Sequence, residues 1–174
     1  FRSGRVVGTD LSEEMVEQGR QIAEARGLHN LTFEHMGAEA LELPEGAFDA
    51  ALCSLGLMYV PDPEQALREM HRVLTPGGRA AAVVWGARKN CGWAEVFPIV
   101  DRRVHTEVCP LFFQLGTGDA LNAAFRTAGF DDVTAERFSV ALPFESETEA
   151  CDAIFWGGPV ALAWRKFDEE KRAD

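Results

Sequence analysis

Residues 6–15 read VVGTDLSEEM, a short apolar run followed by an acidic residue and a helix start. The run Val6–Thr9 is typical of a buried strand, and Asp10 falls at its carboxyl end. Ser12 is placed to cap a helix over residues 13–26. A carboxylate at a strand tip is costly to desolvate without a partner. Asp10 is therefore a candidate ligand-binding residue, although it could instead simply cap the helix.

The segments that follow alternate between strand and helix patterns. Strands are predicted over residues 31–36, 48–55 and 79–85. A helix beginning at Pro61-Asp62-Pro63 lies before the last of them, and TPGG at 75–78 ends it. Short connections between such elements predict an α/β fold with a doubly wound, mostly parallel sheet.

The second half of the chain is less regular and is mainly helical in pattern. One further strand is expected over residues 133–142. Helices are expected over 93–108, 119–128, 145–155 and from 159 to the end.

Composition narrows the class of protein. The chain has 174 residues, 47% of them hydrophobic, which predicts a globular domain. A net charge of −11 without a clustered Lys/Arg face argues against nucleic acid as a partner. No leader or membrane span is predicted. Four scattered cysteines without C-x-x-C spacing argue against a metal site or disulfides and predict a reducing cytoplasm. They are Cys53, Cys91, Cys109 and Cys151.

Residues 37–79 read GAEALELPEGAFDAALCSLGLMYVPDPEQALREMHRVLTPGGR. The linked run A-E-A-L, L-P, F-D-A and L-x-P-G-G, in this order, resembles the class I S-adenosylmethionine-dependent methyltransferases. The branch it resembles is typified by the ubiquinone/menaquinone-biosynthesis C-methyltransferases, and the resemblance covers residues 5–85. It implies a Rossmann-like sheet, S-adenosyl-L-methionine as cofactor, and methyl transfer to a small apolar or aromatic acceptor.

The resemblance also implies a cofactor site at the strand ends. Asp10 would hold the ribose hydroxyls, Leu11 would pack on adenine, and the Ala38 backbone N–H would bind an adenine nitrogen. The family usually has Asp or Asn where this chain has Gly37. Either backbone carbonyls or Glu39 would then replace that contact, or adenine would be held less tightly.

The family's glycine-rich loop, E/D-x-G-x-G-x-G, occurs nowhere in these residues. We therefore expect residues 1–174 to form a partial domain that lacks the first strand with this loop, and the last strand. Residues 1–85 would be the cofactor-binding half, and residues 86–174 the substrate-cover helices with the late strand. The strands carrying Asp10 and Ser54 would keep unpaired inner edges. This chain alone is expected to bind the cofactor poorly and to be inactive.

The sequence predicts the residues near the methyl acceptor less specifically. By resemblance, Ser54 would lie beside the methionine part of the cofactor, and Leu55–Met58 would wall the transfer site. Methyl transfer needs no covalent nucleophile or metal; if it needs a base, Tyr59 and His71 are candidates, with packing as the alternative. The aromatic residues are interpreted either as an acceptor pocket or as ordinary packing; they include Trp93, Phe97, Phe112 and Phe113.

Two other functions stay open. A nicotinamide-dependent oxidoreductase would share Asp10, but it would not explain the run over residues 37–79. A degenerate paralogue that binds only the cofactor or a partner is the other alternative, and Gly37 is the single feature that supports it. The oligomeric state is not predicted.

Overall fold

The computed structural model describes residues 4–103, 112–157 and 160–170. The chain divides into two compact units. The first comprises the residues up to Val83 together with Ala123–Val133, and the second comprises Val84–Asn122 and the residues from Thr134 onward.

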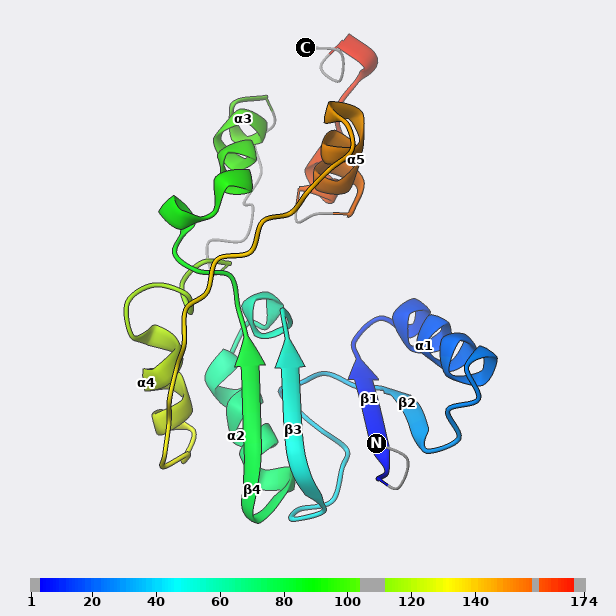
Figure 1. The fold of residues 1–174 in the computed structure, drawn as a ribbon, viewed down its shortest axis with the longest axis vertical. Coiled ribbons are helices and arrows are strands. Elements are labelled where there is room, and N and C mark those ends of the chain that lie inside the picture. Colours follow the sequence, from blue (N-terminus) through cyan, green and yellow to red (C-terminus); the bar gives the residue numbers. More distant parts are fainter. Residues whose placement is uncertain (1–3, 104–111, 158–159, 171–174) are drawn as a thin grey trace. The chain divides into compact units, whose positions relative to one another are not determined.

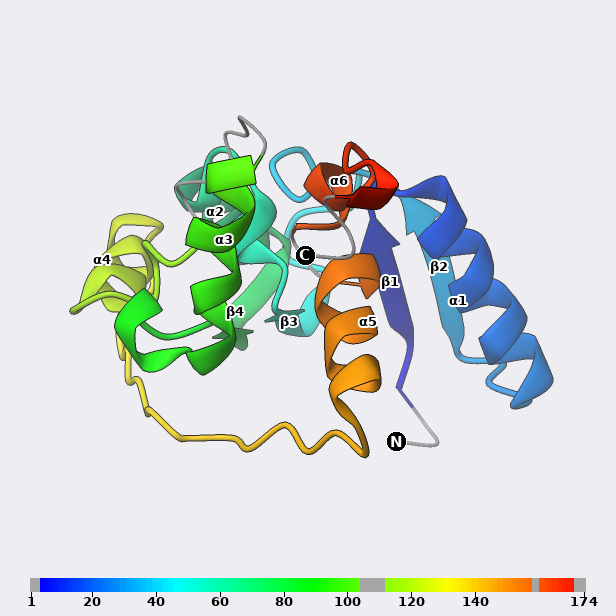
Figure 2. The same ribbon diagram turned by 90° about the horizontal axis from the view of Figure 1, so that it is seen from above.

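The first unit begins with a strand, a helix and a parallel strand: β1 (Val6–Asp10), α1 (Glu13–Ala25) and β2 (Leu31–His35). β1 and β2 pair in register from Val6↔Leu31 to Asp10↔His35. The Ser12 hydroxyl accepts the Met15 N–H at 3.3 Å, so Ser12 caps α1 as predicted. Figures 1 and 2 show α1 beside these two strands.

The Phe33 ring fixes the distance between α1 and the strands. A Cβ on Gly8 of β1 would lie 2.7 Å from this ring, and a Cβ on Gly19 of α1 would lie 2.6 Å from it. Because real side chains do not approach so closely, both positions need glycine for the ring to fit. Val16 and Ala23 complete the buried face of the helix.

A second parallel pair follows: β3 (Phe48–Ser54) and β4 (Leu74–Val83), connected by the 3₁₀ turn η1 (Leu57–Tyr59) and α2 (Pro63–Val73). Figure 1 shows β3 and β4 running in the same direction. Asp62 caps α2 by accepting the Gln65 N–H at 2.9 Å. The apolar stripe of α2 is buried as its spacing predicts, and it consists of Ala66, Leu67, Met70 and Val73.

β4 starts earlier than predicted. TPGG does end α2, but Leu74 already pairs with Phe48. The register then shifts, so that Ala50 pairs with Arg79, and the intervening residues bulge from the strand. Gly77 has a φ of 83°, the left-handed conformation that glycine adopts without strain.

The described residues form two separate two-stranded sheets, β1-β2 and β3-β4. β1 and β3 therefore each pair on one side only within the described part of the chain, as expected for the two inner edges. Leu52, in the middle of β3, is 81% exposed. Each pair thus has a free edge next to the strand tip that carries a predicted site residue.

The second unit is helical. It contains the 3₁₀ turns η2 (Arg88–Asn90) and η3 (Gly92–Glu95), then α3 (Val96–Arg103), α5 (Glu147–Gly157) and α6 (Ala161–Trp164). α4 (Ala120–Thr127) spans the boundary between the units. The predicted helix over 93–108 is thus a 3₁₀ turn followed by α3, and its residues 104–108 lie outside the described residues. No helix among the described residues is long and apolar enough to cross a bilayer.

The strand predicted over residues 133–142 is not formed. Its alternating pattern is real, but a strand also needs a neighbouring backbone to bond, and no described segment pairs with it. Phe138, Val140 and Leu142 are accordingly exposed. Arg137 instead donates hydrogen bonds to the carbonyls of Gly116 at 2.9 Å and Gly118 at 2.6 Å.

A polar network ties the segment after β2 to α2. Arg72 donates to the carbonyl oxygens of Leu43 at 2.8 Å and Leu41 at 2.7 Å. Its Nε and Nη2 also donate to the two carboxylate oxygens of Glu69, each at 2.8 Å. Glu69 in turn accepts the Leu41 N–H at 2.8 Å. One ion pair on α2 therefore satisfies three backbone groups of a segment without regular structure.

The same network lowers the pKa of Glu69 below its ordinary value, chiefly through the hydrogen bond from Arg72, while burial acts in the opposite direction. A carboxyl with a depressed folded-state pKa binds fewer protons than it does in the unfolded chain. Its contribution to stability is therefore present above the ordinary pKa of 4.5 and is lost as the pH falls below it.

We expect Gly19→Ala to destabilise the protein by about 1–3 kcal/mol in urea unfolding, because the new methyl group overlaps the Phe33 ring. Alanine normally favours a helix over glycine, so the sign of the change is diagnostic. The double variant Gly19→Ala/Phe33→Leu should recover part of the loss. An unchanged or raised stability for Gly19→Ala would contradict the tight fit.

We expect Glu69→Gln to weaken the acid dependence of stability. Between about pH 7 and about pH 3 the free energy of unfolding should fall less in this variant than in the wild type, because the group that takes up a proton is gone. The exposed Glu17, which pairs with Arg20 at 3.7 Å, provides the control Glu17→Gln. Equal acid sensitivity in wild type and Glu69→Gln would refute the role of Glu69.

Candidate functional site

The carboxyl ends of β1 and β2 meet at one place. The Met36 N–H donates to the Asp10 carbonyl at 3.1 Å, and His35 Nε2 lies 2.8 Å from the Leu11 carbonyl oxygen. The Leu11 side chain lies over Gly37, where a Cβ would be 3.7 Å from Leu11 Cδ1. The structure therefore brings together Asp10, Leu11 and Gly37, three of the residues predicted for the cofactor.

Asp10 is an exposed carboxylate with capacity for a ligand. Its Oδ1 accepts the Ser12 N–H at 2.8 Å, which stabilises the turn into α1. The residue that caps the helix is Ser12, not Asp10. A structural role in the turn therefore accounts for Oδ1 of Asp10 but not for Oδ2. Oδ2 makes no hydrogen bond to any residue in the described part of the chain. A carboxylate has acceptor sites to spare for a pair of ligand hydroxyls.

The turn after β2 is held by the start of α2. The Ala40 N–H donates to the Gly37 carbonyl at 3.2 Å, with Ala38 inside the turn. Glu39 Oε1 accepts the Asp62 N–H at 2.8 Å, and the Glu39 carbonyl accepts Gln65 Nε2 at 3.3 Å. The Glu39 carboxylate thus already has a structural partner, and the turn is held at both its backbone and its side chain.

The tip of β3 has an unusual backbone. Ser54 pairs with Val83 and is exposed, and Leu55 follows with a φ of 55°. The Leu55 N–H donates to the Val83 carbonyl at 2.8 Å. Leu57 and Met58 are fully buried, so they face the core and not an open site. Of the wall expected over residues 55–58, Leu55 is the large side chain that stays accessible.

The Cys53 side chain packs against the turn that follows β3. Burial raises the pKa of the Cys53 thiol, and backbone hydrogen bonds from Leu57 and Gly56 oppose that change. A Cβ on Gly56 would lie 2.8 Å from Cys53 Sγ. Neither this contact nor the backbone conformation of Leu55 could be predicted from the sequence, because a positive φ is uncommon for leucine and has no local sequence pattern there.

The four predicted acceptor-pocket residues gather in the second unit. Ring centroids of Trp93 and Phe112 lie 5.7 Å apart, those of Trp93 and Phe97 5.8 Å, and those of Phe112 and Phe113 5.1 Å. Phe112 is only 1% exposed, so much of the group is packed core. Trp93 Nε1 is nevertheless buried without a hydrogen-bond partner in the described structure. These four residues are called the aromatic cluster below.

The two base candidates lie in different settings. Tyr59 is 57% exposed and follows the tip of β3. His71 lies in the last turn of α2, where its ring meets Phe130 edge-on with centroids 5.0 Å apart. A packing contact therefore accounts for His71. No three His, Cys, Asp or Glu side chains among the described residues form a group that could hold a metal ion.

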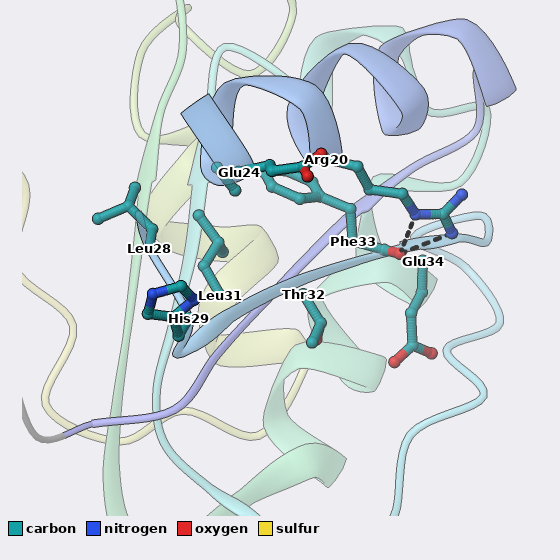
Figure 3. Close-up of a pocket in the computed structure, with 9 residues that line it drawn as sticks. Arg20, Glu24, Leu28, His29, Leu31, Thr32, Phe33 and Glu34 are labelled. Atoms are coloured by element: carbon teal, nitrogen blue, oxygen red, sulfur yellow. Dashed lines mark hydrogen bonds between the residues drawn. The ribbon is translucent and has the colours of Figure 1, made fainter. Parts of the chain in front are cut away.

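An open pocket lies along α1 and the outer edge of β2 (Figure 3). None of the predicted site residues lines it. Arg20 Nε and Nη2 donate to the Phe33 carbonyl at 3.2 and 2.9 Å, as Figure 3 shows. Arg20 thereby satisfies a carbonyl on an exposed sheet edge, which is a protective role.

Comparisons with known proteins agree with this geometry. Residues 1–82 match the family described as "Methyltransferase domain". The demethylmenaquinone methyltransferase of Listeria welshimeri is 42% identical over 94 residues, which cover 54% of this chain and 40% of that protein. The one from Geobacillus stearothermophilus is 32% identical over 154 residues, covering 78% of this chain and 64% of that protein. The chain thus spans about half the length of these curated relatives.

The fold also matches a solved structure from Thermotoga maritima, described as a SAM-dependent methyltransferase and possible histamine N-methyltransferase. The TM-score is 0.51 at 27% identity, over 72% of this chain and 55% of that one. The parallel strand pairs and the solved structure confirm the fold class predicted from sequence. The family match and the relatives agree with the family that the sequence resembles. Together these matches support the class I S-adenosylmethionine-dependent methyltransferases as the family that the chain resembles.

Proposed function

We propose that the full-length protein transfers a methyl group from S-adenosylmethionine to a small aromatic acceptor of the quinol type. In this reaction an electron pair of the acceptor forms a bond to the methyl carbon. The S–CH₃ bond breaks with its electron pair going to sulfur, which loses its positive charge, and the acceptor then releases a proton. The protein's task is to align the two molecules and exclude water.

The observation that carries the proposal is the convergence of Asp10, Leu11 and Gly37 at the carboxyl ends of a parallel strand pair. Ligands of such sheets bind at these ends. The Asp10 carboxylate would accept both ribose hydroxyls, while Leu11 would cover one face of adenine. The Ala38 N–H would donate to an adenine nitrogen.

The remaining cofactor contacts follow from the same placement. Gly37 offers no side chain for the adenine amine, and Glu39 is already bonded to the start of α2. We therefore assign this contact to backbone carbonyls of the turn after β2. Ser54, exposed at the tip of β3, would lie beside the methionine part.

The acceptor class rests on the relatives, which are named demethylmenaquinone methyltransferases. A quinol is planar and apolar with a polar oxygen at each end. The aromatic cluster has matching properties, with four aromatic rings and the unpaired Trp93 N–H. The Tyr59 hydroxyl is our candidate to relay the acceptor's proton: its oxygen would accept that proton while its own proton passes to water. The free thiols of Cys53, Cys91 and Cys151 favour a reducing compartment such as the cytoplasm.

One alternative keeps support from the structure. With Gly37 in place of a side-chain ligand and Glu39 engaged elsewhere, adenine would have fewer contacts than in the family pattern. A paralogue that has lost activity would show this feature. Binding and turnover measurements on the same protein distinguish it from an enzyme.

We expect the full-length protein to bind S-adenosylmethionine in calorimetry, and Asp10→Asn to weaken binding by about tenfold or more, because charge-assisted bonds to the ribose are lost. Asparagine retains an acceptor for the Ser12 N–H, so the turn into α1 survives. Asp49→Asn, an exposed aspartate near the amino end of β3, is the matched control. Equal affinity in wild type and Asp10→Asn would exclude this assignment, and absence of binding in the wild type would exclude the function.

We expect Trp93→Phe to raise the KM for a quinol by about fivefold while the affinity for S-adenosylmethionine is unchanged, because ring contact and the indole N–H are lost from the acceptor side only. Phenylalanine keeps an aromatic ring in the cluster. Trp156→Phe, a half-exposed tryptophan outside the cluster, is the control. An unchanged KM in Trp93→Phe would show that the cluster is packing alone.

A further inference from the structure

Arg88 lies over one ring of the aromatic cluster. Its Cζ is 5.6 Å from the centroid of the Phe97 ring, within the range of a cation–π contact. Phe97 is a firm support for this contact, because it is only 4% exposed. Arg88 itself is exposed, at the start of η2. The contact therefore places an accessible positive charge beside a group of rings that is otherwise apolar.

The guanidinium of Arg88 keeps its hydrogen-bond donors unused. It has five N–H donors, and a contact with the face of a ring leaves them available. Among the described residues, Arg88 makes no hydrogen bond and no ion pair. The other charged side chains of η2 and η3, Lys89 and Glu95, are exposed and are not paired with it. An unpaired cation is ordinary on a surface, but this one is attached to the aromatic cluster.

A second unused donor belongs to the same group of rings. Trp93 Nε1 is buried without a hydrogen-bond partner in the described structure, and the Trp93 ring centroid lies 5.8 Å from that of Phe97. Phe97 thus contacts one charged donor and lies beside one neutral donor. Neither group can accept a hydrogen bond, so a ligand that satisfies both has to supply acceptor oxygens.

The cluster also offers a surface for a flat ring. Trp93 and Phe113 are only half-buried, and their ring centroids lie 5.7 Å apart. The Phe113 ring meets Phe97 edge-on at 5.7 Å between centroids. A planar ligand on the accessible surface of Trp93 and Phe113 would therefore have the guanidinium within one ring's distance. All these residues belong to the second unit.

We propose that Arg88 binds the ionised oxygen of the methyl acceptor, so that the acceptor enters the aromatic cluster as an anion. The inference rests on the proposed methyl transfer and deepens it by assigning the charge state of the acceptor. In a chain with a net charge of −11, an anionic ring is repelled unless a cation receives it at its binding site. Arg88 supplies that cation.

Ionisation also activates the acceptor for methyl transfer. The hydroxyl proton passes to water, and the electron pair that held it stays on the acceptor. An electron pair of this anion forms the bond to the methyl carbon, and the pair of the S–CH₃ bond goes to sulfur. The negative and positive charges thereby cancel. A guanidinium beside the oxygen lowers the pKa of the bound acceptor, because it favours the charged form.

The first test measures binding and needs no turnover. Its probes are 2-hydroxy-1,4-naphthoquinone, which is an anion at about pH 7, and 2-methoxy-1,4-naphthoquinone, a neutral ring of similar shape. In calorimetry with the full-length protein and S-adenosylhomocysteine, the wild type should bind the anion about tenfold more tightly. Arg88→Gln should abolish this preference, because glutamine keeps a donor but not the charge. Its affinity for S-adenosylhomocysteine should stay within about twofold.

Lys89→Gln is the matched control, because Lys89 is the neighbouring exposed cation of η2 and its loss changes the net charge equally. It should keep the preference for the anion, and Arg88→Lys should keep most of it. A wild type without the preference overturns the inference, as does an Arg88→Gln variant that retains it. An equal loss in Arg88→Gln and Lys89→Gln would show a general effect of charge and would also overturn it.

The second test is the pH dependence of methyl transfer to 1,4-naphthohydroquinone, measured in single turnovers without oxygen. Arg88→Gln should move the rise of the rate upward by about one pH unit and slow transfer about tenfold at about pH 7. An unchanged profile together with a lower stability in urea would show that Arg88 only packs on Phe97. A full-length wild type that fails to bind S-adenosylmethionine would instead overturn the proposed function itself, whatever Arg88→Gln does.

Discussion

The ion pair between Arg72 and Glu69 is the contact on which the site most depends. The residues between β2 and β3 form no helix or strand, so their backbone groups need partners from elsewhere. The pair on α2 supplies three of them, at Leu41 and Leu43. Glu39 attaches the start of the same segment to the start of α2. The turn that carries Gly37 and Ala38 is thereby fixed to the helix between β3 and β4.

This network gives a physical meaning to part of the sequence run that marks the family. The segment AEALELP and the helix QALREMHRV are far apart in the chain but supply the two sides of one set of hydrogen bonds. Fold alone does not determine reaction, because one architecture supports many chemistries. Methyl transfer is therefore proposed from the residues at the strand ends and from the relatives, not from the parallel strands themselves.

Local patterns predicted much of the fold. Ser12 and Asp62 cap the helices that their spacing indicates, and the stripe from Ala66 to Val73 is buried. Asp10 could be selected because a strand tip followed by a helix start is a local signal. The contacts of Arg72 and Arg88 could not be predicted, because each depends on residues brought close only by folding. The prediction of a strand over 133–142 was wrong for a related reason. An alternating pattern shows which side chains would share one face of a strand, but it does not show whether a neighbouring strand is there to pair with.

The two edges of the β1-β2 pair differ in whether side chains cover their backbone groups. On the outer edge, Arg20 covers the Phe33 carbonyl, and the charged side chains of Glu24 and Glu34 lie nearby (Figure 3). The inner edges of β1 and β3 have no such guard among the described residues, and the exposed Leu52 adds apolar surface beside one of them. Exposed backbone of this kind attracts strands from other molecules. Within the described residues, the inner edges of β1 and β3 are therefore more open to pairing with a strand of another molecule than the edge that Arg20 covers.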